Sequence, residues 1–237
     1  MNISVIMATY NGEKYIREQL NSIIPFMDDN DELIISDDGS TDGTLGIINL
    51  YRQNDQRIIL VDGPRNGVIK NFENALQLAR KDIIMFADQD DIWLPEKLPF
   101  VREFFRTSRD KVILHDMYMA DDKEIAIGER GTRSFAVRHR RHGVLYNWLY
   151  SGYYGCCIAI TKEFKKNILP FSKYTNMYDQ LIGLIAEYQK CVSFIDKPLI
   201  IHRIHGQNMS QNQTIMARLQ MRVKSYMAFI DTIRSRK

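Results

Sequence analysis

The chain of 237 residues has few cysteines and no hydrophobic run long enough to cross a bilayer. Its three cysteines are an odd number, two of them (Cys156 and Cys157) are adjacent, and none forms a CxxC pair. This pattern argues against structural zinc and against the disulfide framework of an oxidising compartment. The start, Met1 to Met7, lacks the basic and long apolar regions of a signal peptide. We therefore expect a cytoplasmic protein.

The composition is that of a globular protein with a sizeable core. Hydrophobic residues make up 45% and charged residues 26% of the chain, which excludes a disordered or collagen-like protein. We find no internal repeat, low-complexity segment or linker rich in proline and glycine, so one domain with an appendage suffices. The net charge of +3 is spread unevenly, because residues 216–237 hold six basic residues and one acidic residue. Such a tail predicts an anionic partner.

Short β-branched runs alternate with helical patterns through the first half. The expected strands are 3–8, 32–36, 57–61 and 82–87, and the expected helices are 13–25, 42–53, 67–80 and 95–107. This alternation predicts an α/β fold with a mainly parallel central sheet and helices on both faces. Such sheets bind ligands at the carboxyl ends of their strands.

The second half is less regular. We expect a strand at 112–114, a hairpin or loop at 118–130, a mobile basic loop at 131–142, a strand at 153–160, a helix at 176–189, extended chain at 191–204 and a helix at 211–235.

Three carboxylates, Asp88, Asp90 and Asp91, directly follow the expected strand 82–87. Their mutual repulsion costs stability unless a cation neutralises it, and such oxygen ligands suit Mn²⁺ or Mg²⁺ bound to substrate phosphates. The alternative is a solvated acidic turn that caps the next helix. Trp93, just beyond the turn, favours the first interpretation, because a large aromatic beside a charged turn often covers a ligand.

A second acidic pair, Asp37 and Asp38, follows the expected strand 32–36. Part of this segment is N-cap chemistry for the next helix, but capping does not require two further carboxylates. One of them can accept the N3–H of uracil or thymine, and the other can hold ribose or order the loop. Tyr10, after the first strand, offers a flat face that can stack on a base or simply cover the core.

Together these segments resemble the GT-A fold of family 2 glycosyltransferases. The matching stretches are Ser4-Val5-Ile6-Met7-Ala8-Thr9-Tyr10-Asn11, Ile35-Ser36-Asp37-Asp38-Gly39-Ser40-Thr41-Asp42 and Phe86-Ala87-Asp88-Gln89-Asp90-Asp91-Ile92-Trp93-Leu94-Pro95-Glu96-Lys97-Leu98. The resemblance is strong over residues 1–107 and looser as far as residue 210. It implies a GT-A domain at 1–210, with a nucleotide-sugar half at 1–115 and an acceptor half at 116–210, followed by a basic amphipathic helix at 211–237.

The resemblance implies roles at the ligand edge of the sheet. Tyr10 would stack on the base and Asp38 would accept its N3–H, with Asp37 alongside. Asp88 would bind ribose or a metal-bound water, and Asp90 would ligate the Mn²⁺ or Mg²⁺ that bridges both phosphates. The other implied contacts to the nucleotide sugar are Ala8, Thr9, Asn11, Asn66, Lys70, Gln89 and Arg203.

The resemblance also implies a catalytic base and a further metal ligand. Asp179 opens the expected helix 176–189, where related members place the aspartate that takes the acceptor proton. It is otherwise an aspartate favoured in a first helical turn. The segment 201–208 resembles the family's Tyr-Arg-x-His-x-x-Asn element, with His202 where Tyr is common. Arg203 would contact the pyrophosphate and His205 the metal, unless both are polar surface residues at a strand end.

The acceptor side of the implied site holds Trp93, Gly155, Cys156 and Gln180. Gly155 would allow close approach of substrate, and Cys156 looks structural because nothing nearby suggests a nucleophile. Gln180 stands where many members carry Trp, so acceptor contacts are expected to differ.

The C-terminal helix allows two interpretations. Its cationic, amphipathic pattern suits contact with an anionic membrane surface, where lipid-linked acceptors are found. It equally suits a terminal helix packed on its own domain with a solvated basic face. No recognition motif or interleaved aromatic residues support nucleic-acid binding.

The resemblance thus implies a cytoplasmic, inverting, metal-dependent glycosyltransferase. The membrane interpretation of the C-terminal helix would place it at the inner face of the cell membrane. The enzyme would move a sugar from dTDP-rhamnose or a UDP-hexose to a saccharide or lipid-linked saccharide in bacterial surface polysaccharide synthesis. The chief alternative is a catalytically silent module that binds nucleotide and Mg²⁺. Receiver-like domains need an acidic pair after the first strand, and dinucleotide-binding oxidoreductases need a glycine-rich turn there, and this chain has neither.

Overall fold

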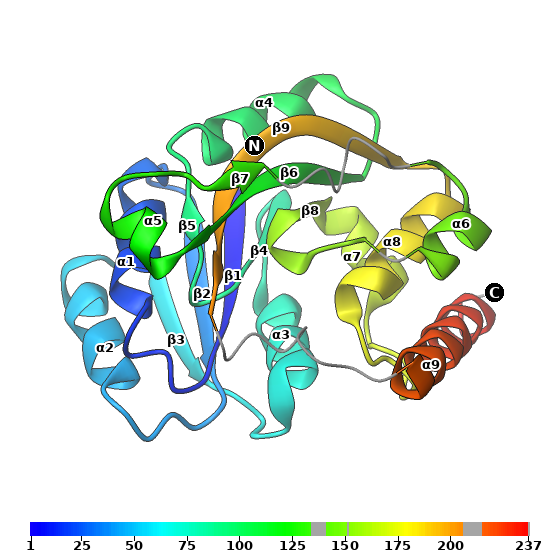
Figure 1. Ribbon diagram of the computed structural model, residues 1–237, viewed down its shortest axis with the longest axis horizontal. Coiled ribbons are helices and arrows are strands. Elements are labelled where there is room, and N and C mark those ends of the chain that lie inside the picture. Colours follow the sequence, from blue (N-terminus) through cyan, green and yellow to red (C-terminus); the bar gives the residue numbers. More distant parts are fainter. Residues whose placement is uncertain (134–140, 151, 206–214, 237) are drawn as a thin grey trace.

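The computed structural model of the chain describes residues 1–133, 141–150, 152–205 and 215–236 (Figure 1). Within these ranges one sheet has the strand order β3-β2-β1-β4-β8-β6-β9-β5, and β7 pairs with β6. The strands are β1 Ile3–Thr9, β2 Glu32–Asp37, β3 Ile58–Asp62, β4 Ile83–Ala87, β5 Ile92–Trp93, β6 Val112–Asp121, β7 Thr132–Arg133, β8 Ile158–Thr161 and β9 Val192–Ile204. The helices are α1 Ile16–Ile23, α2 Thr44–Asn54, α3 Gly67–Leu78, α4 Lys97–Thr107, α5 Asp122–Ala126, α6 Val144–Leu149, α7 Lys162–Ile168, α8 Tyr178–Tyr188 and α9 Ile215–Arg234, with 3₁₀ turns η1 Ile24–Phe26 and η2 Gly155–Cys157.

The first four strands form the parallel part of the sheet that the alternating pattern predicts. β1 pairs in parallel with both β2 and β4, and β2 pairs in parallel with β3. In Figure 1, α1 and α2 lie on one side of these strands and α3 on the other. The α/β fold with helices on both faces is therefore confirmed.

The other strands make the second half of the sheet mixed. β8 runs antiparallel to its neighbours β4 and β6, and β9 runs parallel to β6. Residues 118–130, expected as a hairpin or loop, instead complete β6 and form α5. The capping box of Asp121 and Glu124 gives α5 its start. Most of the predicted basic loop 131–142 lies outside the described residues.

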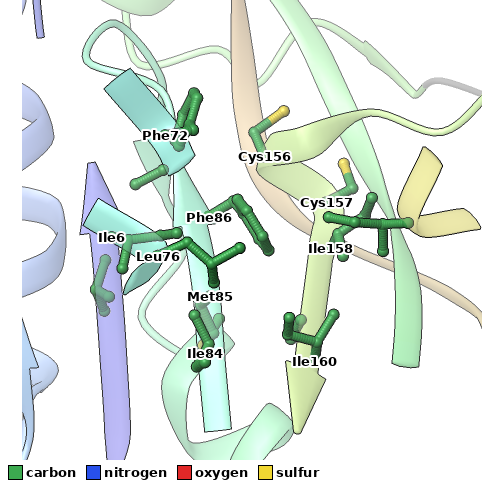
Figure 2. Close-up of a cluster of buried hydrophobic side chains, with 14 of the residues drawn as sticks. Ile6, Phe72, Leu76, Ile84, Met85, Phe86, Cys156, Cys157, Ile158 and Ile160 are labelled. Carbon is green, nitrogen blue, oxygen red and sulfur yellow. The ribbon is translucent and has the colours of Figure 1, made fainter. Parts of the chain in front are cut away.

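The core lies between the sheet and its helices. Figure 2 shows Phe72 and Leu76 of α3 near Phe86 of β4, with Cys156 and Cys157 at the far side of the same cluster. Both cysteines and Cys191 are free and buried, in agreement with a structural role. None of the described helices is both long and apolar enough to span a membrane.

Candidate functional site

The ends of β1 and β2 meet at one edge of the sheet, as parallel strands require. Thr9 is the register partner of Asp37, and Asp37 is the partner of Asp62 at the end of β3. The side chains of Ala8 and Thr9 are buried, at 9% and 1% exposure. Any contact of these two residues with a ligand would thus depend on their backbone.

Both carboxylate oxygens of Asp37 accept hydrogen bonds that order the neighbouring loops. One carboxylate oxygen accepts the N–H groups of Gly39 (3.1 Å) and Ser40 (2.7 Å). The other accepts the hydroxyl groups of Thr9 (2.7 Å) and Ser40 (2.6 Å). Of the two roles left open by the sequence, ribose binding or loop ordering, the structure supports the second for Asp37.

Asp38 sits beside the start of α3. Its carboxylate accepts the N–H groups of Asn66 (3.3 Å) and Gly67 (2.8 Å), which brings Asn66 to the predicted base-binding carboxylate. Lys70, one turn further along α3, pairs with Glu73. Tyr10 projects from the neighbouring loop with 57% of its surface exposed, so its ring is available for stacking.

A pocket of about 230 Å³ opens beside these loops. It is lined by Asp37, Gly39, Ser40, Thr41, Leu45, Asp62, Gly63 and Arg65. Arg65 was not among the predicted residues, although it directly precedes Asn66. The backbone conformation, and not the sequence pattern, distinguishes Arg65. Its φ is 55°, and its side chain approaches Gly39, whose φ is 94°.

Gln89 ties the loop after β4 to the loop after β1. Its side-chain carbonyl accepts the Tyr10 N–H (3.0 Å), and its amide donates to the Tyr10 carbonyl (3.1 Å). A Cβ on Gly12 would lie 2.3 Å from the same Gln89 oxygen, which explains a glycine there. Asn11 makes a similar link, since its N–H donates to Ser40 Oγ (2.8 Å) and its side chain accepts the Thr41 N–H (2.8 Å). Gln89 and Asn11 therefore hold the site together, and their predicted contacts with a nucleotide sugar stay predictions.

The acidic loop carries strongly perturbed carboxylates. Burial, followed by the charges of Asp91 and Asp90, raises the pKa of Asp88 well above its ordinary value. Burial and the charge of Asp91 also raise the pKa of Asp90. A divalent cation would relieve this repulsion, and the available oxygen and imidazole donors suit Mn²⁺ or Mg²⁺. The residues present thus fit a metal at this loop.

The residue that follows β9, His205, contacts the acidic loop. His205 Nε2 lies 2.9 Å from Asp90 Oδ2, so the two predicted metal ligands are adjacent. The His205 ring also stacks on Tyr15, with ring centroids 4.8 Å apart. A pocket of about 460 Å³ adjoins this point and is lined by Lys14, Tyr15, Asp121, Asp122, Lys123, Ile204 and His205.

Arg203 is engaged with protein groups around the acidic loop. Its guanidinium pairs with Asp122 (2.8 Å) and with Glu18, and its Nε donates to the Asp90 carbonyl (3.0 Å). The side chain is 5% exposed. These contacts make Arg203 a support for the acidic loop, and its predicted contact with the pyrophosphate stays a prediction.

A buried cluster lies next to the predicted metal ligands. Asp91 Oδ1 and His202 Nδ1 are 2.7 Å apart, and Cys156 offers a third possible ligand atom within 4.8 Å of both groups. Burial disfavours the charged forms of both side chains, but the attraction between the two charges is the larger effect. The pKa of Asp91 is therefore lowered, and that of His202 is raised to about 10. We interpret this cluster as an internal ion pair that anchors the loop and not as a metal site, because the positive charge of His202 already balances the Asp91 carboxylate.

Asp179 lies in the first turn of α8, opposite the acidic loop. Its carboxylate accepts the N–H of Gln180 (2.7 Å), and its charge adds to those that raise the pKa of Asp88. A segment some ninety positions further along the chain thus lies near the acidic loop, and the role of Asp179 as a base stays a prediction.

The three acceptor-side predictions of Trp93, Gly155 and Gln180 need correction. Trp93 is 2% exposed, and the ammonium of Lys97 lies 3.7 Å from its ring centroid, so it fills the core instead of covering a ligand. A Cβ on Gly155 would lie 1.9 Å from the Tyr178 hydroxyl, so it is this side chain, not a substrate, that demands glycine. Gln180 is 1% exposed and accepts a hydrogen bond from Ser225 of α9 (2.9 Å), so its side chain is engaged inside the protein and not open to an acceptor.

Lys97 is a functional-site neighbour that the pattern did not single out. It is fully buried and donates to the Cys156 carbonyl (2.8 Å). Burial lowers its pKa to about 8. Nothing in its sequence position, at the start of an amphipathic helix, distinguishes it from an exposed lysine.

Comparison with known proteins gives consistent results. The sequence model described as Glycosyl transferase family 2 matches residues 4–169. The dTDP-rhamnosyl transferase RfbG of Shigella flexneri is 30% identical over 216 residues, which cover 85% of this chain and 72% of that protein. An uncharacterized glycosyltransferase of Nostoc sp. is 26% identical over 215 residues, 88% of this chain and 66% of that protein.

A solved structure shares the architecture. S. aureus TarS 1–349, crystallised in complex with UDP-GlcNAc, matches with a TM-score of 0.71 and 25% identity, and the match covers 90% of this chain and 62% of that chain. This chain thus spans about two thirds of the length of these relatives.

Proposed function

The chain belongs to glycosyl transferase family 2 and has a GT-A fold, and from this premise we propose that it transfers a sugar from a nucleotide diphosphate to an acceptor hydroxyl in bacterial polysaccharide synthesis. One observation carries the proposal. The ends of β1, β2 and β4 place an exposed Tyr10, the Asp38 carboxylate and the Asp88–Asp91 loop at one edge, and α8 brings Asp179 to the same loop.

The donor we propose is a UDP- or dTDP-linked sugar. The Asp38 carboxylate would accept the N3–H that uracil and thymine share, with Tyr10 stacked on the ring. The pocket lined by Asp37 and Arg65 offers the space beside them. The names of two relatives support this choice, since one is a dTDP-rhamnosyl transferase and another was crystallised with UDP-GlcNAc.

We propose that Asp90 and His205 hold Mn²⁺ or Mg²⁺, with Asp88 beside them. The support is the 2.9 Å approach of His205 Nε2 to Asp90 and the repulsion that raises the pKa values of Asp88 and Asp90. When bound, the cation would supply positive charge to the departing diphosphate. Arg203, Gln89 and the Asp91–His202 pair fix the loop that presents these ligands.

The proposed reaction is a single displacement with inversion at the sugar carbon. Asp179 takes the proton of the acceptor hydroxyl as that oxygen forms its bond to the sugar C1. The bond from C1 to the phosphate oxygen breaks with its electron pair, and the nucleoside diphosphate leaves. Asp179 therefore ends the step protonated and returns its proton to solvent.

The acceptor is proposed to be a saccharide or lipid-linked saccharide at the cytoplasmic face of the membrane. The three free, buried cysteines suit a reducing compartment. The boundary between a domain at 1–210 and a helix at 211–237 also stays a proposal, because residues 206–214 lie outside the described part of the chain.

The test is release of nucleoside diphosphate from UDP-GlcNAc and dTDP-rhamnose with Mn²⁺ and a saccharide acceptor panel. Wild type should release UDP or dTDP and form product. Asp90→Asn should lose most of this activity, whereas the control Asp29→Asn, an exposed carboxylate away from the site, should not. Binding of nucleotide without any release or product would favour the catalytically silent module instead.

A further inference from the structure

Helix α9 packs on its domain through one face and exposes apolar side chains on the opposite face. Its inner face is formed by Ser225, Ala228, Phe229 and Thr232, all buried at 5% exposure or less. The opposite face carries large apolar side chains that remain exposed. They are Met216 (65%), Leu219 (56%), Val223 (56%), Tyr226 (45%) and Met227 (40%), here called the α9 face.

The helical period puts these five residues on one side. Leu219, Val223 and Met227 therefore point outward and not into the core. The helix packs on its own domain, as one of its two interpretations expects, and it still presents an apolar side.

Helix α6 contacts α9. The Trp148 indole donates to the Arg222 carbonyl (2.8 Å), and its ring centroid lies 5.3 Å from that of Tyr226. Leu145 and Leu149 stand three residues before and one residue after Trp148, with 66% and 49% exposure. They lie on the same short helix as Trp148, the residue that joins α6 to α9.

Basic side chains outnumber acidic ones around the α9 face. Lys224 is exposed on one flank of the apolar stripe, and Arg222 lies on the other flank, where its guanidinium donates to the Trp148 carbonyl (2.6 Å). Asp231, the single acidic residue of α9, is held by the Ser172 hydroxyl (2.6 Å). An apolar stripe bordered by cations is the pattern of a helix that lies in the headgroup region of an anionic membrane.

We propose that the α9 face, with Leu145 and Leu149 of α6, docks the protein on an anionic lipid bilayer. This goes beyond the transfer reaction and does not depend on the identity of the donor. A mixed apolar and cationic surface fits lipid better than a second copy of the chain, since two such faces would bring like charges together.

The docking surface is also linked to the candidate base. Gln180, the residue after Asp179, accepts from Ser225 on α9, and its amide donates to the Trp148 carbonyl of α6 (3.4 Å). Docking through α6 and α9 would therefore hold the Asp179 end of the site close to lipid-linked substrates.

The experiment is flotation of the protein with vesicles of phosphatidylcholine alone and of phosphatidylcholine mixed equally with phosphatidylglycerol. Wild type should float with the mixed vesicles and less with phosphatidylcholine, and added salt should weaken the binding. The double variant Leu219→Glu/Val223→Glu should bind at least about tenfold more weakly, because it removes two apolar side chains from the lipid contact and adds two negative charges.

A matched control is Leu50→Glu on α2, because Leu50 is 54% exposed on a different part of the surface. It should float like wild type. Thermal unfolding and UDP binding should be the same in all variants, which separates a docking defect from misfolding or loss of the donor site.

Two results would overturn the proposal. One is flotation of the double variant equal to wild type. The other is absence of wild-type flotation with the mixed vesicles; a dimer by light scattering that the double variant converts to a monomer would then assign the α9 face to a second copy.

Discussion

The two sides of the candidate site are built differently. On the donor side, the loops after β1 and β2 hold each other through side-chain-to-backbone hydrogen bonds and leave Tyr10 57% exposed. On the side of Asp179, the flanking residues Tyr178 and Gln180 are buried at 8% and 1%. Donor-side substitutions should therefore change binding with little effect on folding, whereas changes around Asp179 should affect stability as well as catalysis.

The largest expected effect comes from Asp179→Asn, which removes the proposed base and keeps the shape. We expect the transfer rate to fall by about 10² to 10⁴, the usual contribution of a general base. The KM for the donor should stay within about twofold, because Asp179 is not part of the proposed nucleotide pocket. Steady-state kinetics with saturating acceptor measure both values, and retained transfer would remove Asp179 from this role.

Gly155→Ala tests the packing on the Asp179 side. The added Cβ would meet the Tyr178 hydroxyl at 1.9 Å, so we expect a loss of about 1–3 kcal/mol in the free energy of unfolding. Urea denaturation measures it.

Gly46→Ala on α2 is the matched control, because no atom lies within 4 Å of its added Cβ. It should be neutral or stabilising. Equal stability of the two variants would contradict the close contact between Gly155 and Tyr178.

Tyr10→Ala tests the open donor side. Loss of stacking should weaken UDP or dTDP binding by about 1–2 kcal/mol, or roughly tenfold, with unfolding unchanged. Calorimetric titration measures it. Tyr150→Ala, at a residue 65% exposed on the other side of the site, should bind nucleotide like wild type; an equal loss in both would argue against stacking on Tyr10.

Lys97 gives the smallest effect, a dependence of stability on pH. Its pKa falls from 10.5 to about 8 in the folded chain, so between these values the unfolded chain binds more protons. Stability should therefore rise with pH across this interval, by up to roughly 1 kcal/mol per pH unit. Lys97→Met should remove this part of the slope in urea denaturation, and an unchanged slope would contradict the shifted pKa.

The same contrast explains what the sequence could reveal. The strand ends of a parallel sheet share one edge, so the short motifs after β1, β2 and β4 are enough to place Tyr10, Asp38 and Asp90 together. The expected elements of this half agree with the observed bounds within a few residues.

Roles on the other side depend on long-range packing that local patterns do not encode. Whether Gln180 faces a substrate or Ser225 depends on where α9 docks, and the burial of Trp93 depends on its packing in the core. Arg203 looks like a free cation in the sequence, but its partners Glu18 and Asp122 come from distant segments. The outward apolar side of α9 is equally hidden in the sequence, because periodicity marks a stripe without saying what it faces.

The central claim is that one edge of the sheet binds the nucleotide with a metal, while Asp179 acts only in the transfer. The most direct measurement is thermal unfolding of wild type and Asp179→Asn with UDP, dTDP, GDP or ADP, each with and without Mn²⁺. The account predicts a Mn²⁺-dependent rise with UDP or dTDP alone, equal in both proteins, although the variant forms no product. No rise with any nucleotide, or a rise that Asp179→Asn abolishes, would contradict it.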